Sequence, residues 1–223
     1  MAHPAACLFD LDGLLLDTEP LHAEAWQQAA TQFSCPLSAE ELLALRGRRR
    51  HDCADQVRRW IGDRRQPVPS REELLAVRQP IAEALLVHAA PMPGAPELVE
   101  HCATLGLPMA LATSSSRAAV ELKATPHPWL AQIHVRVHGD DPALQRGKPA
   151  PDVFLLAAER LGVQASRCWA FEDSPAGVQA AAAAGCRVHV LPPDHLSAAE
   201  RRDLYPGIDH FLNSLREVMD ALQ

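Results

Sequence analysis

Short apolar runs alternate with helical segments along most of this chain, and that alternation constrains the fold more than any other feature. Strand candidates occupy residues 5–9, 107–112, 134–137, 168–171 and 187–191. Helix candidates lie at 97–105, from about 116, at 151–161 and at 176–184. Strands that alternate with helices are typical of a parallel sheet with right-handed crossovers. The sequence therefore predicts an α/β fold with an open parallel sheet.

The alternation is interrupted after the first strand candidate. From about Pro20 to Leu86 the pattern is helical, with Leu21, Ala25 and Ala29 on one helix face, and no convincing strand is found there. Prolines and a glycine at 91–94 mark the return of strands. We predict an α/β core from residues 1–18 and 90–223, with a helical domain inserted at 19–89.

Composition narrows the range of partners. A formal net charge of −7 argues against nucleic acid as a binding partner. No apolar run is long enough to span a bilayer, and no signal pattern precedes the first strand, so a cytoplasmic protein is expected. The six cysteines form no C-x-x-C pair, which disfavours zinc and disulfides and favours free thiols. Since no feature demands a second copy, we expect a monomer.

Polar groups of distinct chemistry lie near the ends of the predicted strands. They are the segment Asp10–Gly13, the pair Thr113 and Ser114, the loop Gly147–Pro149 and the segment Glu172–Ser174. In open parallel sheets, active sites gather at the carboxyl ends of the strands. We therefore expect these groups to converge on one crevice.

The carboxylates fit a metal-assisted reaction. Mg²⁺ prefers oxygen ligands, which Asp10 and Asp173 can supply, with Glu172 either a ligand or a neighbour of the ligands. An ionised Asp10 is a competent nucleophile when a metal neutralises the phosphate that it attacks. Asp12, two residues later, can protonate the leaving oxygen and then activate a water.

The remaining groups complete a site for phosphoryl transfer. Thr113 or Ser114 can hydrogen-bond the phosphoryl group, and Lys148 can balance the charge on the nucleophile and the phosphoryl oxygens. Gly13 would let the chain turn sharply away from the site. Each pattern alone is common in loops, but four in order near strand ends indicate phosphotransfer onto Asp10.

Four segments carry a family resemblance: DLDGLLLDTE (10–19), LATSS (111–115), GKPAPD (147–152) and FEDSPAGVQAA (171–181). Together they resemble the motifs of haloacid dehalogenase-like hydrolases, over essentially the whole chain. The insertion is similar to the helical cap of the β-phosphoglucomutase-like and pseudouridine-5′-phosphatase-like branch. The resemblance implies a Rossmann-like open parallel sheet core with an inserted helical cap domain.

The resemblance also implies residue roles. Asp10 would be the nucleophile, Asp12 the acid and base, Thr113 or Ser114 the phosphoryl binder and Lys148 the charge balancer. Mg²⁺ would be held by Asp10, the main-chain carbonyl of Asp12 and Asp173, with Glu172 close by. An aspartate at the Asp12 position is typical of phosphatases and phosphomutases in this superfamily, whereas true dehalogenases lack it.

Two residues of the predicted cap are candidate substrate contacts. His22 and Arg50 fall where sugar-phosphate enzymes of this branch carry polar cap residues. Arg50 closes the most concentrated run of positive charge, made by Arg46, Arg48, Arg49 and Arg50 with His51. Such a run can be a solvated helix end or a cationic rim for a second anionic group on the substrate. We choose Arg50 as the rim residue, and Arg78 is a weaker candidate.

The segment His138–Pro142 resembles the longer G-D-D-P loop of the phosphatases in this branch. We therefore predict a phosphatase that hydrolyses a small phosphomonoester such as a sugar, polyol or nucleoside phosphate. A β-phosphoglucomutase-like isomerase would share every core residue and stays an alternative. A protein that only binds phosphate is the third alternative, although every position that the chemistry needs is filled.

Overall fold

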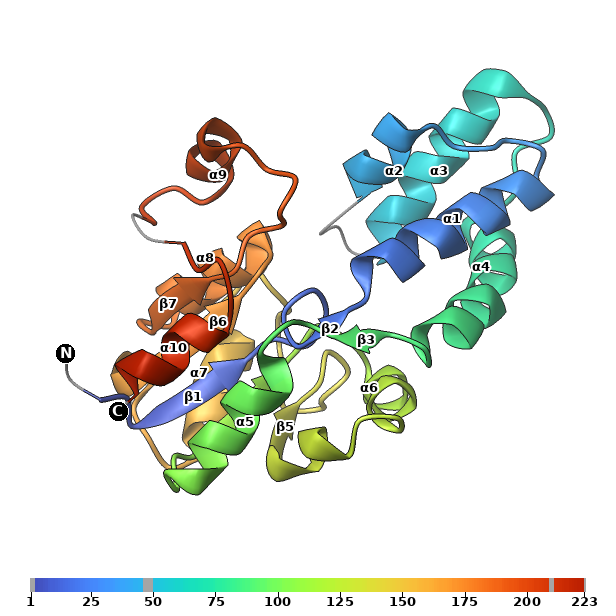
Figure 1. The fold of residues 1–223 in the computed structure, drawn as a ribbon. Coiled ribbons are helices and arrows are strands. Elements are labelled where there is room, and N and C mark those ends of the chain that lie inside the picture. Colours follow the sequence, from blue (N-terminus) through green and yellow to red (C-terminus); the bar gives the residue numbers. More distant parts are fainter. Residues whose placement is uncertain (1–2, 46–49, 209–210, 223) are drawn as a thin grey trace. The chain divides into compact units, whose positions relative to one another are not determined.

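The computed structural model describes residues 3–45, 50–208 and 211–222. The chain divides into two compact units, residues 1–17 with 90–223 and residues 18–89. The first unit contains the parallel sheet and the second is helical (Figure 1).

Five strands of the described residues form the main sheet of the first unit, in the order β5-β4-β1-β6-β7. They are β1 (Ala6–Phe9), β4 (Met109–Ala112), β5 (Val135–Val137), β6 (Cys168–Glu172) and β7 (Arg187–Val190). Every neighbouring pair is parallel. The central strand β1 is buried throughout, as expected for a strand covered on both faces. The predicted open parallel α/β sheet is confirmed.

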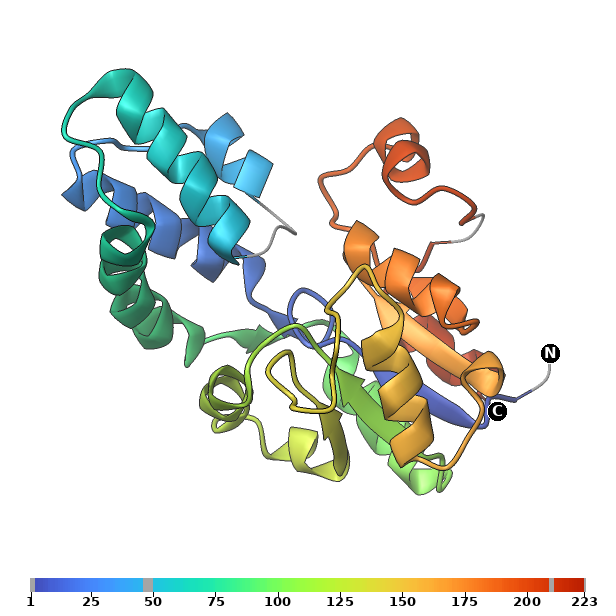
Figure 2. The ribbon, with the colours of Figure 1, turned by 180° about the vertical axis from the view of Figure 1, so that it is seen from behind.

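Helices cover both faces of this sheet. Helix α7 (Asp152–Arg160) packs on β1, β4 and β5, and α8 (Pro175–Ala183) packs on β6 and β7. Helices α5 (Ala95–Thr104) and α10 (Arg216–Ala221) contact each other on the opposite face, as Figures 1 and 2 show from the two sides. Helices α6 (Arg117–Ala124) and α9 (Ala198–Leu204) and two 3₁₀ turns, Pro128–Gln132 and Ala165–Arg167, complete the unit.

Small side chains let α7 approach the sheet closely. Ala6, Ala110 and Ala170 lie on the covered face, and Phe154 of α7 packs into the same cluster. All of these side chains are fully buried. These small side chains and Phe154 pack together as one close-packed core between α7 and the sheet.

A two-stranded antiparallel ribbon marks the point where the helical unit is inserted. Strand β2 (Leu16–Asp17) pairs with β3 (Ala90–Pro91), and the Met92 N–H donates to the Leu15 carbonyl at 3.0 Å. We did not predict this ribbon, because strands of two residues are too short to show a period. The chain thus leaves and re-enters the first unit at adjacent points.

The second unit contains α1 (Glu19–Gln32), α2 (Ala39–Leu45), α3 (Arg50–Arg64) and α4 (Arg71–Leu86). Its own core includes Trp26, Ala29, Val57, Ile61 and Leu74. Helix α4 begins with a capping box, in which the Glu73 N–H donates to the Ser70 hydroxyl and the Ser70 N–H donates to the Glu73 carboxylate. The predicted helical character of this segment is confirmed for its described residues.

Two general features bear on the sequence-based expectations. None of the helices in the described ranges is both long and apolar enough to cross a membrane. All six cysteines are buried free thiols: Cys7, Cys35, Cys53, Cys102, Cys168 and Cys186.

Candidate active site

The ends of three neighbouring strands bring the predicted polar residues together. Asp10 follows β1, Thr113 follows β4, and Asp173 follows β6. The Asp10 N–H donates to the Phe171 carbonyl at 3.1 Å, which continues the pairing of β1 and β6 by one residue. Because β4, β1 and β6 are adjacent and parallel, their carboxyl ends share one edge of the sheet.

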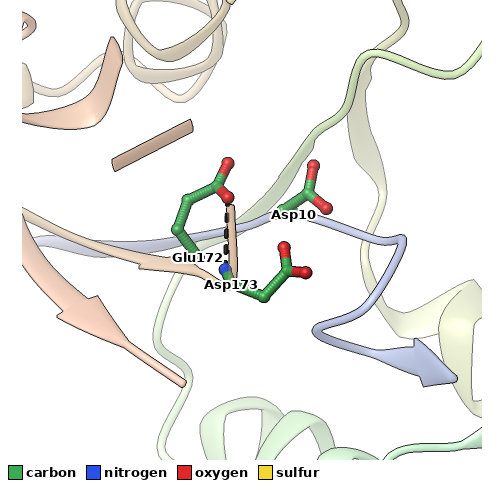
Figure 3. A group of neighbouring side chains, drawn as sticks. All are labelled: Asp10, Glu172 and Asp173. Carbon is green, nitrogen blue, oxygen red and sulfur yellow. Dashed lines mark hydrogen bonds between the residues drawn. The ribbon is translucent and has the colours of Figure 1, made fainter. Parts of the chain in front are cut away.

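Three buried carboxylates form a cluster at this edge. Asp10, Glu172 and Asp173 each place an oxygen within 4.8 Å of the others, and Figure 3 shows the three side chains gathered where β1 and β6 end. All three are at most 8% exposed. Such a set of oxygen donors fits a hard divalent cation, because buried carboxylates need a counter-charge.

Lys148 supplies one positive charge to this cluster. Its Nζ lies 2.5 Å from Asp10 Oδ1 and 2.5 Å from Glu172 Oε1, and the side chain is 6% exposed. The ammonium also lies over the ring of Phe154, 5.2 Å from its centroid. Lys148, which was predicted to balance the charge on the nucleophile, thus lies in direct contact with the Asp10 carboxylate.

The pKa values of Lys148 and Asp10 reflect the balance between burial and the charges of neighbouring groups. Burial by itself lowers the pKa of Lys148, but the charges of Asp10 and Glu172 outweigh it and raise that pKa above its usual value. Burial raises the pKa of Asp10 from 3.8 to about 7, and the opposing attraction of Lys148 only partly offsets this. The neighbouring charges of Glu172 and Asp12 raise the Asp10 pKa further.

Glu172 is held on its other side by the turn that follows β6. Its Oε2 accepts from the N–H groups of Asp173 and Ser174 at 3.2 and 3.3 Å, and from the Ser174 hydroxyl at 3.1 Å. The first of these bonds is drawn in Figure 3. One oxygen of Glu172 thus faces Lys148 while the other fixes its own loop.

Two glycines make room for the acidic cluster. Gly13 has φ +82°, and a Cβ there would lie 2.1 Å from Asp173 Oδ2. A Cβ on Gly177 would lie 1.9 Å from Glu172 Oε1. The sharp turn expected at Gly13 is therefore present, and it brings the loop after β1 against Asp173. We did not single out Gly177 from the sequence.

The loop after β4 carries the predicted phosphoryl-binding hydroxyls. Thr113 is buried, and its Oγ1 accepts from the Ser115 N–H at 3.1 Å, whereas Ser114 is exposed. The loop after β5 approaches closely, since a Cβ on Gly139 would lie 2.1 Å from the Ser114 carbonyl oxygen. Gly139 therefore allows contact between the two loops.

A model of the haloacid dehalogenase-like hydrolases matches residues 4–185 of this chain. The chain belongs to this family. It is 37% identical over 198 residues to a probable pseudouridine-5′-phosphatase of Drosophila melanogaster, covering 86% of this chain and 83% of the relative. It is 33% identical over 198 residues to (DL)-glycerol-3-phosphatase 2 of Arabidopsis thaliana, covering 87% and 82%. The crystal structure of CbbY from Rhodobacter sphaeroides in complex with phosphate superposes with a TM-score of 0.77, at 28% identity and 96% coverage of both chains.

In this hydrolase the carboxylate of Asp12 has partners that we did not predict from the sequence. Lys123 Nζ lies 2.5 and 2.6 Å from its two oxygens, and the Ser115 hydroxyl donates to Oδ2 at 2.7 Å. The predicted contribution of Asp12 to a metal site is its main-chain carbonyl, so these contacts leave that prediction open. The sequence offered only one indication that Lys123 is buried: it lies three residues after Val120, and therefore on the same face of helix α6.

Tyr205 is a second residue that the sequence did not reveal. Its hydroxyl donates to the main-chain carbonyl of Asp173, and the side chain is 1% exposed. Tyr205 follows α9 and lies beyond the residues that the family model matches. The carboxyl-terminal part of the chain therefore supports the loop that carries Asp173.

The candidate cap residues lie in the second unit. His22 of α1 is half-buried, and its Nδ1 lies 2.9 Å from Nη2 of the buried Arg78, whose guanidinium packs 4.8 Å from the centroid of the Trp26 ring. Burial lowers the pKa of Arg78 to about 10. Arg50 is exposed and donates to Gln79 Oε1 at 3.1 Å. Three other members of the predicted basic run, Arg46, Arg48 and Arg49, lie outside the described residues.

Proposed function

We propose that this hydrolase is a Mg²⁺-dependent phosphatase that releases phosphate from a small phosphomonoester through an aspartyl-phosphate on Asp10. The observation that carries the proposal is the buried Asp10 carboxylate, which lies against Lys148 within a cluster of acidic groups. The family membership and the phosphatase names of the similar curated proteins support the same reaction.

Asp10 attacks the phosphorus, and Asp12 gives its proton to the leaving oxygen. Asp12 then takes a proton from the water that releases phosphate from Asp10. Lys148 balances the charge on Asp10 and on the phosphoryl oxygens, to which Thr113 or Ser114 donates a hydrogen bond.

The side chains of Asp10 and Asp173 and the main-chain carbonyl of Asp12 would hold Mg²⁺, and the buried oxygen donors of the cluster fit it. When bound, Mg²⁺ neutralises negative charge on the phosphate group. Glu172 is assigned a supporting role, because its two oxygens already accept from Lys148 and from the loop after β6. We also propose a cytoplasmic location, with which the free thiols agree. We propose a monomer, because a single chain supplies every proposed core residue.

Phosphate release from a panel of phosphomonoesters tests this function. The panel contains pseudouridine 5′-phosphate, glycerol 3-phosphate, sugar phosphates including β-glucose 1-phosphate, and nucleotides, each with Mg²⁺ and with a chelator. Metal-dependent release from one class supports a phosphatase and names its substrate. Loss of β-glucose 1-phosphate without phosphate release would instead support a mutase. No reaction with any substrate would leave a protein that only binds phosphate.

Replacing Asp173 with alanine is expected to weaken Mg²⁺ binding at least about 10-fold, because the variant lacks one of the proposed oxygen ligands. Isothermal titration calorimetry of the protein with Mg²⁺ measures the dissociation constant directly. Asp220→Ala removes an exposed carboxylate on α10 and serves as the matched control. An unchanged titration curve for Asp173→Ala would exclude Asp173 as a ligand.

Arg50 and His22 are proposed to contact the substrate, and Arg50 to bind a second anionic group. Arg50→Ala should raise KM about 10-fold for substrates with two anionic groups and less than about 2-fold for a simple aryl phosphate, because only the former would lose a charge-assisted contact. Steady-state kinetics on both classes checks this. Equal changes would mean that Arg50 is only a surface charge.

A further inference from the structure

Lys123 is a buried lysine that belongs to none of the four family motifs. Its side chain is 1% exposed, and Nζ lies within hydrogen-bonding distance of both oxygens of Asp12 and of the Ser115 hydroxyl, at 2.5, 2.6 and 2.9 Å. An ammonium group has three protons to donate, and these contacts use all of them. The polar end of Lys123 is thus directed entirely at Asp12 and at the hydroxyl that also binds Asp12.

A purely structural role does not explain this arrangement well. Lys123 lies on the face of α6 that also buries Val120, where an apolar side chain would pack without any desolvation penalty. Replacing buried ion pairs with apolar residues is often neutral or stabilising, so such a pair is weak evidence for a stabilising role. The partner, however, is Asp12, the residue assigned to proton transfer.

The contacts hold Asp12 in place while leaving it accessible. The Asp12 side chain remains 19% exposed, although both of its oxygens accept hydrogen bonds. Ser115 adds a second donor to Oδ2 at 2.7 Å, which restricts rotation of the carboxylate.

We propose that Lys123 is a positioning residue for proton transfer by Asp12, and that the Ser115 hydroxyl helps to hold the same carboxylate. This inference rests on the proposed phosphatase function. In the first step the bond from phosphorus to the ester oxygen breaks, a bond from phosphorus to a carboxylate oxygen of Asp10 forms, and the proton of Asp12 passes to the departing oxygen. Asp12 is left as a carboxylate, and the Lys123 ammonium stabilises the negative charge that develops there.

The effect of Lys123 on the reaction should depend on the leaving group. An alkoxide is a strong base and needs a proton as it departs, whereas a nitrophenolate departs readily without one. A residue that acts through the proton of Asp12 must therefore matter far more for alkyl phosphates than for p-nitrophenyl phosphate. A residue that only stabilises the fold would affect both substrates equally.

The experiment compares kcat/KM for p-nitrophenyl phosphate and for the alkyl phosphate of the panel that the wild type hydrolyses fastest. Lys123→Met is expected to lose about 100-fold on the alkyl phosphate and less than about 3-fold on the aryl phosphate. Ser115→Ala should show the same selectivity with a smaller loss. Val120→Ala is the matched control on α6, because it removes packing without touching Asp12, and should leave the ratio of the two kcat/KM values unchanged.

Each outcome is decisive. Equal losses on the two substrates in Lys123→Met, or no loss, would overturn the positioning role while leaving the phosphatase intact. If Lys123→Met does not fold, Ser115→Ala decides the question by its own ratio, since it removes only a hydroxyl. If the wild type releases phosphate from neither substrate, the proposed function fails and this inference fails with it.

Discussion

Asp10→Asn is expected to abolish turnover, with a loss of at least about 10³-fold in kcat. An amide cannot form the acyl-phosphate that the proposed reaction needs, and loss of a nucleophile removes a whole step rather than one stabilising contact. The measurement is phosphate release at saturating substrate and Mg²⁺. Asp220→Asn makes the same chemical change on an exposed position of α10 and should retain full activity.

The same variant should keep or gain thermal stability when metal is chelated. Burial raises the pKa of Asp10 from 3.8 to about 7 in the folded chain, so ionised Asp10 costs stability, and this cost grows as pH rises through that range. A neutral amide of equal size avoids the cost and can still accept from Lys148. We expect the melting temperature of Asp10→Asn at pH 8 to equal or exceed that of the wild type. Retained turnover would remove Asp10 from the mechanism.

Lys148→Met is expected to have the second-largest effect, because it acts on both activity and stability. The ammonium lies 2.5 Å from both Asp10 and Glu172, and its removal leaves buried carboxylates without their neighbouring positive charge. Breaking a buried ion pair by removing one partner typically costs about 3–5 kcal/mol. We expect such a loss in the free energy of unfolding at pH 8, together with a fall in kcat of at least about 10²-fold.

The pH dependence separates the charge of Lys148 from its packing. A carboxyl group whose folded-state pKa is raised, as for Asp10, contributes stability at low pH that is lost as pH rises. The destabilisation by Lys148→Met should therefore be smaller at pH 5 than at pH 8, in denaturant titrations with a chelator present. Arg202→Met, at an exposed position of α9, is the control for removing a positive charge. A loss that does not change with pH would mean that Lys148 acts through packing alone.

The strand-end rule accounts for most of what the sequence could predict. Asp10, Thr113 and Asp173 follow apolar runs that form adjacent parallel strands, so their meeting at one edge follows from local pattern and topology. Lys148 lies in a loop rather than at a strand end; the motif indicated that it balances the charge on the nucleophile, but its contact with Glu172 was not predicted. The order and separation of these residues along the chain were therefore sufficient to predict that they form one site.

The features that the sequence did not reveal depend on contacts between distant segments. Lys123 meets Asp12 across 111 positions of the chain, and Tyr205 meets Asp173 across 32. Neither residue stands in a pattern that marks it, because a lysine on a helix or a tyrosine just after one is usually a surface or packing residue. The ribbon of β2 and β3 is likewise made by partners that lie far apart in sequence and close in space.

The ribbon of β2 and β3 has a consequence for how proteins with such an insertion diversify. Leu16–Asp17 pairs with Ala90–Pro91 as the two strands of one hairpin. For the sheet-bearing unit, the inserted helical segment between these strands is therefore equivalent to the loop of that hairpin. The entropy of closing a flexible loop grows only logarithmically, by about 0.6 kcal/mol for each doubling of length. Evolution can therefore enlarge, shrink or exchange the inserted helices with little penalty to the sheet. The proposed substrate contacts His22 and Arg50 lie in the inserted helices, whereas the proposed catalytic residues lie in the sheet-bearing unit, so substrate choice and chemistry can change separately within one gene.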